Sequence, residues 1–207
     1  MKLRLHARRG VAAVLAAVLA AACSSPPAQT DKLVFAQPVV LLGEVHDNAA
    51  QHALRLRAFE DWLARGARPA LLMEQFDRER QGDIDRLRAQ RPPPDADALI
   101  AAATASRDGW NWAFYKPFVA LALRYDLPIV AANVSRDDAR AVIREGLAAR
   151  GFDAAVPADI ESAIAREVLD SHCGMLDEAT ARRMTRAQVA RDQFMARAVE
   201  AHAEQGV

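Results

Sequence analysis

Two short motifs carry the side chains that could do chemistry in this sequence. Glu44 and His46 lie two residues apart after one apolar run, and Glu74 follows another apolar run. In extended backbone, residues two apart point the same way, so Glu44 and His46 share one side. Two carboxylates and an imidazole can bind a divalent metal or act as a general acid and base. The alternative is that these residues only cap the following helix.

The elements that must position these side chains are strands. Three apolar runs, each beginning with a proline, cover residues 38–43, 69–73 and 128–132. The runs are too apolar to have a wet face, which is typical of parallel strands covered by helices on both sides. Ligands of open parallel sheets bind at the carboxyl ends of the strands, where the two motifs would meet.

Helical patterns fill the rest of the chain. Apolar stripes and capping signals predict helices at residues 52–63, 96–106, 117–125, 135–150 and 177–204. The fold class is therefore α/β, with an open, mainly parallel sheet flanked by helices and a helical insertion. Val207 stands where a further strand would begin, so we expect the last strand or strands to be missing from this sequence. His52 lies on an apolar stripe and either is a core histidine or faces the site.

The N-terminus has the pattern of a secretory signal. Residues 1–10 carry four cations and no acid, and residues 11–22 are an unbroken apolar run. This run is shorter than the roughly 20 residues that span a bilayer, so we expect cleavage rather than a permanent anchor. The whole chain has 27 basic and 27 acidic residues. Because there is no basic excess, nucleic-acid binding is excluded.

Residues 19–25 resemble the lipobox of bacterial lipoproteins, although Ala20 stands where leucine is usual. We predict a signal peptide over 1–22, a lipid on Cys23, a flexible tether over 23–37 and one domain over 38–207. Two serines after Cys23 resemble an outer-membrane sorting signal. The alternative is an ordinary Ala-x-Ala cleavage site with an incidental cysteine. After lipidation Cys173 is the remaining thiol, so no intramolecular disulfide is expected.

Six motifs in order resemble the ChaN family of haem-binding lipoproteins. They are residues 41–48, 73–76, 110–117, 131–133, 171–174 and 188–196. The similarity covers about residues 38–200. It implies a fold related to the Tiki and erythromycin-esterase proteins, a role in iron acquisition through haem binding, and a homodimer that holds two haems face to face.

The resemblance also implies that a tyrosine binds the iron, with a histidine and a lysine near the propionates. We prefer Tyr115, in an aromatic loop, over Tyr125, which lies on an apolar helix stripe. A phenolate is a hard anionic ligand that suits ferric haem. Lys116 could meet a propionate, and His46 is a candidate histidine. His172 either contacts the cofactor or belongs to a structural turn.

Aromatic side chains surround Tyr115 in the sequence. Trp110, Trp112 and Phe114 could pave a porphyrin face, or they could plug the mouth of the sheet as core residues. The sequence does not choose between these two roles.

Two functional classes follow, and we favour the first. The first is an outer-membrane lipoprotein, facing the periplasm or the cell surface, that binds haem and has no catalytic role. Its partners are haem and, through the lipid, the membrane. The second is a hydrolase, metal-dependent or acid/base, that uses Glu44, His46 and Glu74. The family's final Gly-x-Gly-His motif is not reached in this sequence, which counts against the hydrolase. A lipid-anchored interaction module is the third alternative.

Overall fold

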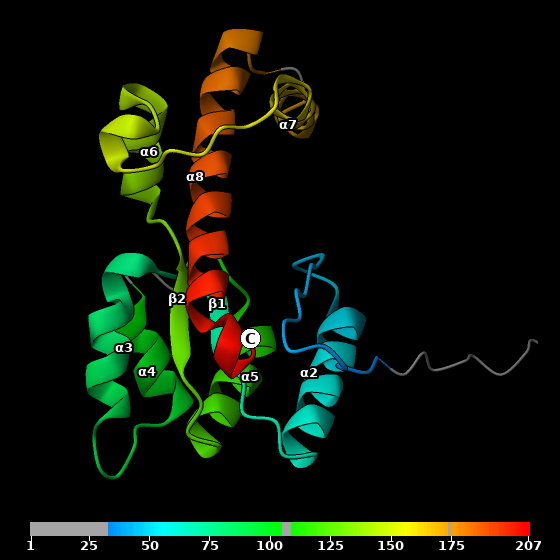
Figure 1. The fold of residues 1–207 in the computed structure, drawn as a ribbon, viewed down its shortest axis with the longest axis vertical. Coiled ribbons are helices and arrows are strands. Elements are labelled where there is room, and N and C mark those ends of the chain that lie inside the picture. The colour runs from blue at the N-terminus through cyan, green and yellow to red at the C-terminus, as the bar shows by residue number, and fades with distance from the viewer. Residues whose placement is uncertain (1–32, 105–108, 174) are drawn as a thin grey trace, which may run out of the picture. The chain divides into compact units, whose positions relative to one another are not determined.

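The structure is a computed structural model that describes residues 33–104, 109–173 and 175–207 (Figure 1). The predicted signal peptide, Cys23 and most of the tether lie outside the described residues. Residues 34–207 form one unit. Within it Phe35, which the sequence places in the tether, packs edge-on against Trp62 with ring centroids 5.6 Å apart. Among the described helices, none is long and apolar enough to cross a membrane.

A parallel two-stranded sheet lies at the centre of this unit. Strand β1 (Leu71–Asp77) pairs with β2 (Ile129–Asn133), and Met73 lies opposite Ala131. Both of these facing residues are buried, as expected for parallel strands covered on both faces. The second and third predicted strands and the α/β class are confirmed.

The first apolar run behaves differently. Residues 38–43 begin with a bend at residues 38 and 39 and form no strand of the described sheet, which contains β1 and β2. Val40 N donates to the Val207 carbonyl, and Val207 N donates to the Pro38 carbonyl, both at 2.9 Å. A strand needs a continuous ladder of such bonds along a partner. The prediction of a third strand in the sheet is therefore wrong for the described residues.

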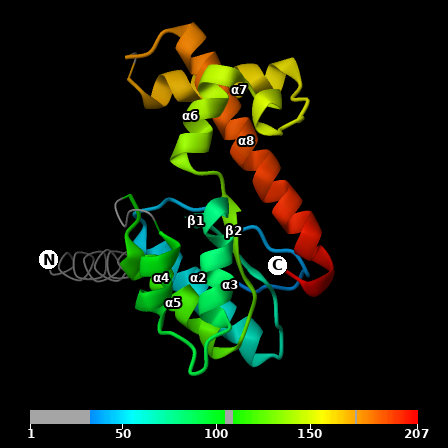
Figure 2. The same ribbon diagram turned by 90° about the vertical axis from the view of Figure 1, so that its left-hand side faces the viewer.

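Seven α-helices accompany the sheet in the described part of the chain. They are α2 (Ala49–Ala64), α3 (Gln81–Arg88), α4 (Ala96–Ala103), α5 (Trp112–Arg124), α6 (Arg136–Glu145), α7 (Ala158–Ser171) and α8 (Glu178–His202). Three short 3-10 turns are also present: η1 (Arg78–Arg80) after β1, η2 (Ala148–Arg150) after α6 and η3 (Ala203–Gln205) after α8. Both ribbon views show α6 and α7 beside the first half of α8, whereas the second half of α8 reaches the sheet (Figures 1 and 2).

Local sequence explains where most helices begin and end. The side chain of an Asn, Asp or Ser accepts a backbone hydrogen bond in the first turn of five helices. These N-caps are Asn48, Asp95, Asn111, Ser135 and Asp177. Gly66, with φ 95°, stands just after α2, because glycine adopts a positive φ without strain.

Two predicted helix boundaries are wrong. Because Asn111 caps α5, that helix begins at Trp112, and Pro117 lies inside it. Tyr115 therefore lies on a helix and not in a loop. Helix α6 ends at Glu145, where Gly146 has a φ of 91°, and does not continue to residue 150. Helices α3 and α7 have no counterpart among the predicted helices.

The outer edge of β2 is covered by a side chain. Gln81 Nε2 donates to the Ile129 carbonyl at 3.0 Å, and Ala131 N donates to Gln81 Oε1 at 2.7 Å. The amide thus takes the place of a neighbouring strand and protects the edge from further pairing.

Candidate functional site

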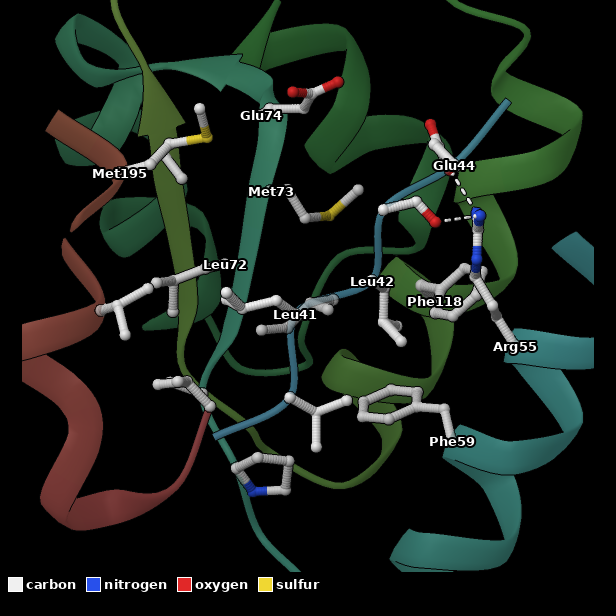
Figure 3. Close-up of a pocket in the computed structure, with 18 of the residues that line it drawn as sticks. Leu41, Leu42, Glu44, Arg55, Phe59, Leu72, Met73, Glu74, Phe118 and Met195 are labelled. Carbon is white, nitrogen blue, oxygen red and sulfur yellow. Dashed lines mark hydrogen bonds and ion pairs between the residues drawn. The ribbon is translucent and has the colours of Figure 1, made fainter. Parts of the chain in front are cut away.

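A cavity of about 820 Å³ lies between residues 40–46 and β1. Figure 3 shows that Glu44 and Glu74 stand at one end of it, with aliphatic and aromatic side chains along the rest. This volume falls in the range of small-molecule and cofactor sites, which are mostly apolar with a few convergent polar groups. The polar end is therefore the candidate functional site.

Glu44 is the centre of this polar end. Its Oε1 lies 2.5 Å from the Tyr115 hydroxyl and 2.8 Å from His46 Nδ1. Its Oε2 lies 2.7 Å from Arg55 Nη1 and 3.6 Å from His52 Nδ1. One carboxylate thus connects the segment after residues 38–43 to both α2 and α5.

The protonation of Glu44 and Tyr115 follows from this geometry. Burial raises the pKa of Glu44, but hydrogen bonds from Tyr115 and His46, together with the nearby charges on α2, lower the pKa below its ordinary 4.5. Burial and then the hydrogen bond to Glu44 raise the pKa of Tyr115 well above its ordinary 10. At neutral pH the site therefore holds a carboxylate and a protonated phenol.

Glu74 reaches the same place from the end of β1. Its Oε1 lies 4.0 Å from His46 Nε2. Burial raises the pKa of Glu74, the charges of His46 and Arg191 oppose this shift, and the charge of Glu44 adds to it. One ligand atom from each of Glu44, His46 and Glu74 lies within 4.8 Å of the other two. The structure thus brings together the three residues that the sequence predicted at one site.

Aromatic rings pack around the two histidines of the site. His52 is buried and stacks on Phe114, with centroids 4.4 Å apart, and Tyr115 meets its edge at 5.1 Å. Trp110 lies edge-on to His46 at 4.9 Å. His52 therefore faces the site and is also part of the packing.

Trp112 contacts both the sheet and Tyr115. It stacks on the buried Phe76 of β1, with centroids 5.6 Å apart. It also meets Tyr115 edge-on at 6.2 Å, so this half-buried ring packs between the strand and the candidate site.

Two predicted cofactor residues lie apart from this cluster. Lys116 is exposed, and its Nζ pairs with Asp97 Oδ2 at 2.5 Å. His172 follows α7, and its Nδ1 lies 2.7 Å from the Val168 carbonyl. In the described part of the chain neither residue lines the cavity. The structure therefore brings Tyr115 and His46 together but not Lys116 and His172.

Sequence reasoning missed two residues of α2 that hold the site. Arg55 is 7 % exposed and donates to the Gly43 carbonyl and, at 3.2 Å, to Gln51 Oε1. Gln51 Oε1 also accepts from Val45 N at 3.1 Å. The available signal was spacing: Arg55 follows His52 by three residues, which puts its charge on the buried helix face.

Glu74 at the carboxyl end of β1 and the neighbouring Glu44 and His46 lie where open parallel α/β proteins bind their ligands. Residues 32–206 match the family model described as haem-binding uptake, Tiki superfamily, ChaN. The chain belongs to this family, so the resemblance seen in its motifs is confirmed.

A solved structure has the same fold. It is described as cofacial haem binding to ChaN of Campylobacter jejuni and superposes with a TM-score of 0.66 at 18 % sequence identity. The match covers 79 % of this chain and 66 % of the Campylobacter chain, so this chain spans just under two thirds of that relative. Comparison with curated proteins gave no significant match.

Proposed function

We propose that this protein binds haem and acts in haem or iron uptake. The proposal rests on the match of residues 32–206 to the family model that is described as haem-binding uptake. The solved Campylobacter relative, in which cofacial haem binding is described, supports the same ligand. A face-to-face haem pair within a homodimer is part of the proposal.

The donors at the polar end fit haem iron. Tyr115 lines the cavity, and its oxygen becomes a hard anionic ligand once the proton leaves. The Tyr115 hydroxyl donates a hydrogen bond to Glu44 Oε1, and His46 Nδ1 is hydrogen-bonded to the same oxygen. The phenolic proton can therefore pass to the Glu44 carboxylate, which already accepts the Tyr115 hydrogen bond. Haem supplies the ferric charge that favours the phenolate.

Apolar surface beside His46 suits a porphyrin face. Val45, next to His46 in the chain, is 55 % exposed, and Trp110 lies against the His46 ring. Exposed apolar groups next to polar donors are typical of a ligand site.

The test is a haem titration of the purified protein, followed by its absorption spectrum. We expect a saturable spectral change that Tyr115→Phe alters, with at least tenfold weaker binding. Tyr125→Phe is the matched control, because Tyr125 packs under the Arg68 guanidinium and does not line the cavity in the described structure. No saturable change in the wild type would contradict haem binding. A normal spectrum in Tyr115→Phe would contradict Tyr115 as the ligand, and His46→Ala would then test His46.

We also propose that the protein is an outer-membrane lipoprotein anchored through Cys23, facing the periplasm or the surface. The charged and apolar halves of residues 1–22 and the lipobox-like residues before Cys23 support this. In a bacterial host, Cys23→Ser should release the protein from the membrane fraction, whereas Cys173→Ser should leave it there. Membrane association of Cys23→Ser would contradict the anchor.

A second candidate function is a hydrolase site, metal-dependent or acid/base, built from Glu44, His46 and Glu74. The 4.8 Å grouping of their ligand atoms favours it. The Arg55 guanidinium counts against a metal, because it already pairs with Glu44 at 2.7 Å. Metal analysis of the purified protein decides: a stoichiometric metal that is lost in Glu74→Gln but kept in His172→Ala would favour this function over the first.

A further inference from the structure

A second cavity, of about 450 Å³, runs along the outer edge of β2. Residues 128–131 of this edge line it, together with side chains of α3 and α8. It shares no lining residue with the cavity beside Glu44. Its volume lies at the lower end of the range of small-molecule sites, so it suits a compact ligand.

Three arginines converge on this cavity. Arg78 comes from η1, Arg88 from α3 and Arg197 from α8. Because they belong to three separate elements, their meeting is a property of the tertiary structure and not of one solvated helix face. Among the described residues that line the cavity, Asp85 is the single acid. An excess of positive charge in a concave site attracts anions.

Two of these arginines are held by carboxylates that lie outside the cavity. Arg78 Nη2 bonds to the buried Asp138, and Arg197 Nη2 bonds to Asp153 Oδ1 at 2.5 Å. Neither aspartate belongs to the lining in the described structure. The Arg78 guanidinium also lies over the Phe194 ring, 5.6 Å from its centroid, which helps to fix its plane. The carboxylates thus orient the guanidinium groups and leave the cavity wall positive.

Arg88 is the arginine with the weakest partners. Its side chain is 20 % exposed, and its Nη2 reaches the carbonyl and Oδ1 of Asp126, both at 3.4 Å. The Asp126 side chain is 80 % exposed, so this pair contributes little. In the described part of the chain, Nε and Nη1 of Arg88 make no hydrogen bond. A mostly buried guanidinium with unused donors favours an oxyanion, because its fork can bind two oxygens at once.

The backbone beside the cavity does not compete for a ligand. The Gln81 amide already bonds to the Ile129 carbonyl and the Ala131 amide. His202 Nδ1 donates to the Ala198 carbonyl at 2.8 Å, which leaves Nε2 of this lining residue to accept or donate. Recognition must therefore come from the charged side chains and His202.

We propose that this cavity binds a compact polyanion, a small molecule with two or more phosphate or carboxylate groups, through Arg78, Arg88 and Arg197. Three guanidinium groups match more than one oxyanion group, and the volume excludes a large ligand. The proposal is independent of haem binding, since the two cavities have no residue in common.

The test is calorimetric titration of the whole purified protein, without haem, at low ionic strength. Inorganic pyrophosphate and citrate are the two probes, and the tighter one identifies phosphate or carboxylate as the preferred group. We expect saturable binding of at least one probe with one site per chain. Arg88→Gln should weaken it at least tenfold. Arg86→Gln is the matched control, because it removes the same charge from α3, its side chain is 67 % exposed and it does not line the cavity; we expect less than a twofold change.

Asp85→Asn tests the proposal in the opposite direction. It removes the negative charge of the lining, so the better probe should bind at least threefold more tightly. Absence of saturable binding of both probes, equal weakening in Arg88→Gln and Arg86→Gln, or no tightening in Asp85→Asn would each overturn the proposal. If Arg88→Gln fails to fold, Asp85→Asn still decides. A haem titration of Asp85→Asn should match the wild type, so this proposal and haem binding fail separately.

Discussion

The Tyr115 hydroxyl lies 2.5 Å from Glu44 Oε1, a hydrogen bond between residues 71 positions apart. Tyr115 is 5 % exposed, and the Glu44 side chain is 13 % exposed, so this bond is largely shielded from water. Hydrogen bonds to charged groups are stronger than neutral ones. The pair therefore both fastens α5 to the segment before α2 and sets the protonation of the proposed haem ligand.

Tyr115→Phe should destabilise the protein. It removes a hydrogen bond to a charged, mostly buried carboxylate, while Arg55 and His46 still partner Glu44. We expect the free energy of unfolding to fall by about 1–3 kcal/mol, measured by urea denaturation. Tyr125→Phe should cost less, and equal losses in the two variants would show that the bond to Glu44 adds nothing.

The phenol of Tyr115 should ionise late. Because its folded pKa lies above the ordinary value of 10, its contribution to stability is fully present below about pH 10 and is lost as the pH rises through the folded pKa. The measurement is ultraviolet absorbance of phenolate in the Tyr125→Phe variant, which leaves Tyr115 as its single tyrosine. A phenolate step at or below pH 10 in the folded protein would contradict the prediction.

Replacing Glu44 by glutamine should weaken haem binding at neutral pH. The amide keeps the shape of the carboxylate but is a far weaker acceptor for the phenolic proton, so we expect at least a tenfold loss of affinity in a haem titration. Glu60→Gln, on the exposed side of α2, is the control and should bind normally. Unchanged affinity in Glu44→Gln would rule out Glu44 as the proton acceptor.

Asp138 should make the fold sensitive to acid. It is 5 % exposed and bonds to Arg78 of η1 and Arg150 of η2. Burial raises its pKa, but hydrogen bonds from Arg150 and Arg78 lower it below 3.8. A depressed folded pKa contributes stability above pH 3.8 that is lost as the pH falls through the folded value.

Asp138→Asn tests this contribution. We expect a loss of about 1–2 kcal/mol at pH 7, less than for a fully buried pair because both arginine side chains are about a third exposed. The loss of stability should shrink as the pH falls below the pKa of the Asp138 carboxyl in the folded protein. Asp137→Asn, whose side chain is 92 % exposed, should change little. A loss that does not depend on pH would point to packing instead of charge.

Gln81→Ala should loosen the outer edge of β2. The Ala131 amide and the Ile129 carbonyl each lose a partner, so we expect a cost of about 1–2 kcal/mol and faster amide exchange at Ala131. The exposed Gln90→Ala serves as the comparison. If exchange at Ala131 stayed slow, the Gln81 amide would not be what covers this edge.

Local patterns in the sequence were enough for several features. Apolar runs after prolines predicted β1 and β2, and the capping signals at Ser135 and Asp177 marked helix starts. The two-residue spacing of Glu44 and His46 put both side chains on one side, and they share a hydrogen bond there. These features depend on neighbours in the chain, through strand alternation and the first helical turn, so no distant contact is needed to read them.

Only the tertiary structure decided which side chains meet. Arg55 and Tyr115 reach Glu44 from α2 and α5, whereas Lys116, next to Tyr115 in sequence, turns to Asp97 on α4. Adjacent helical residues point in directions about 100° apart, so sequence proximity to a ligand residue does not place a side chain in the site. Which helix face meets the strand ends is set by packing across the whole domain, and no local pattern records it.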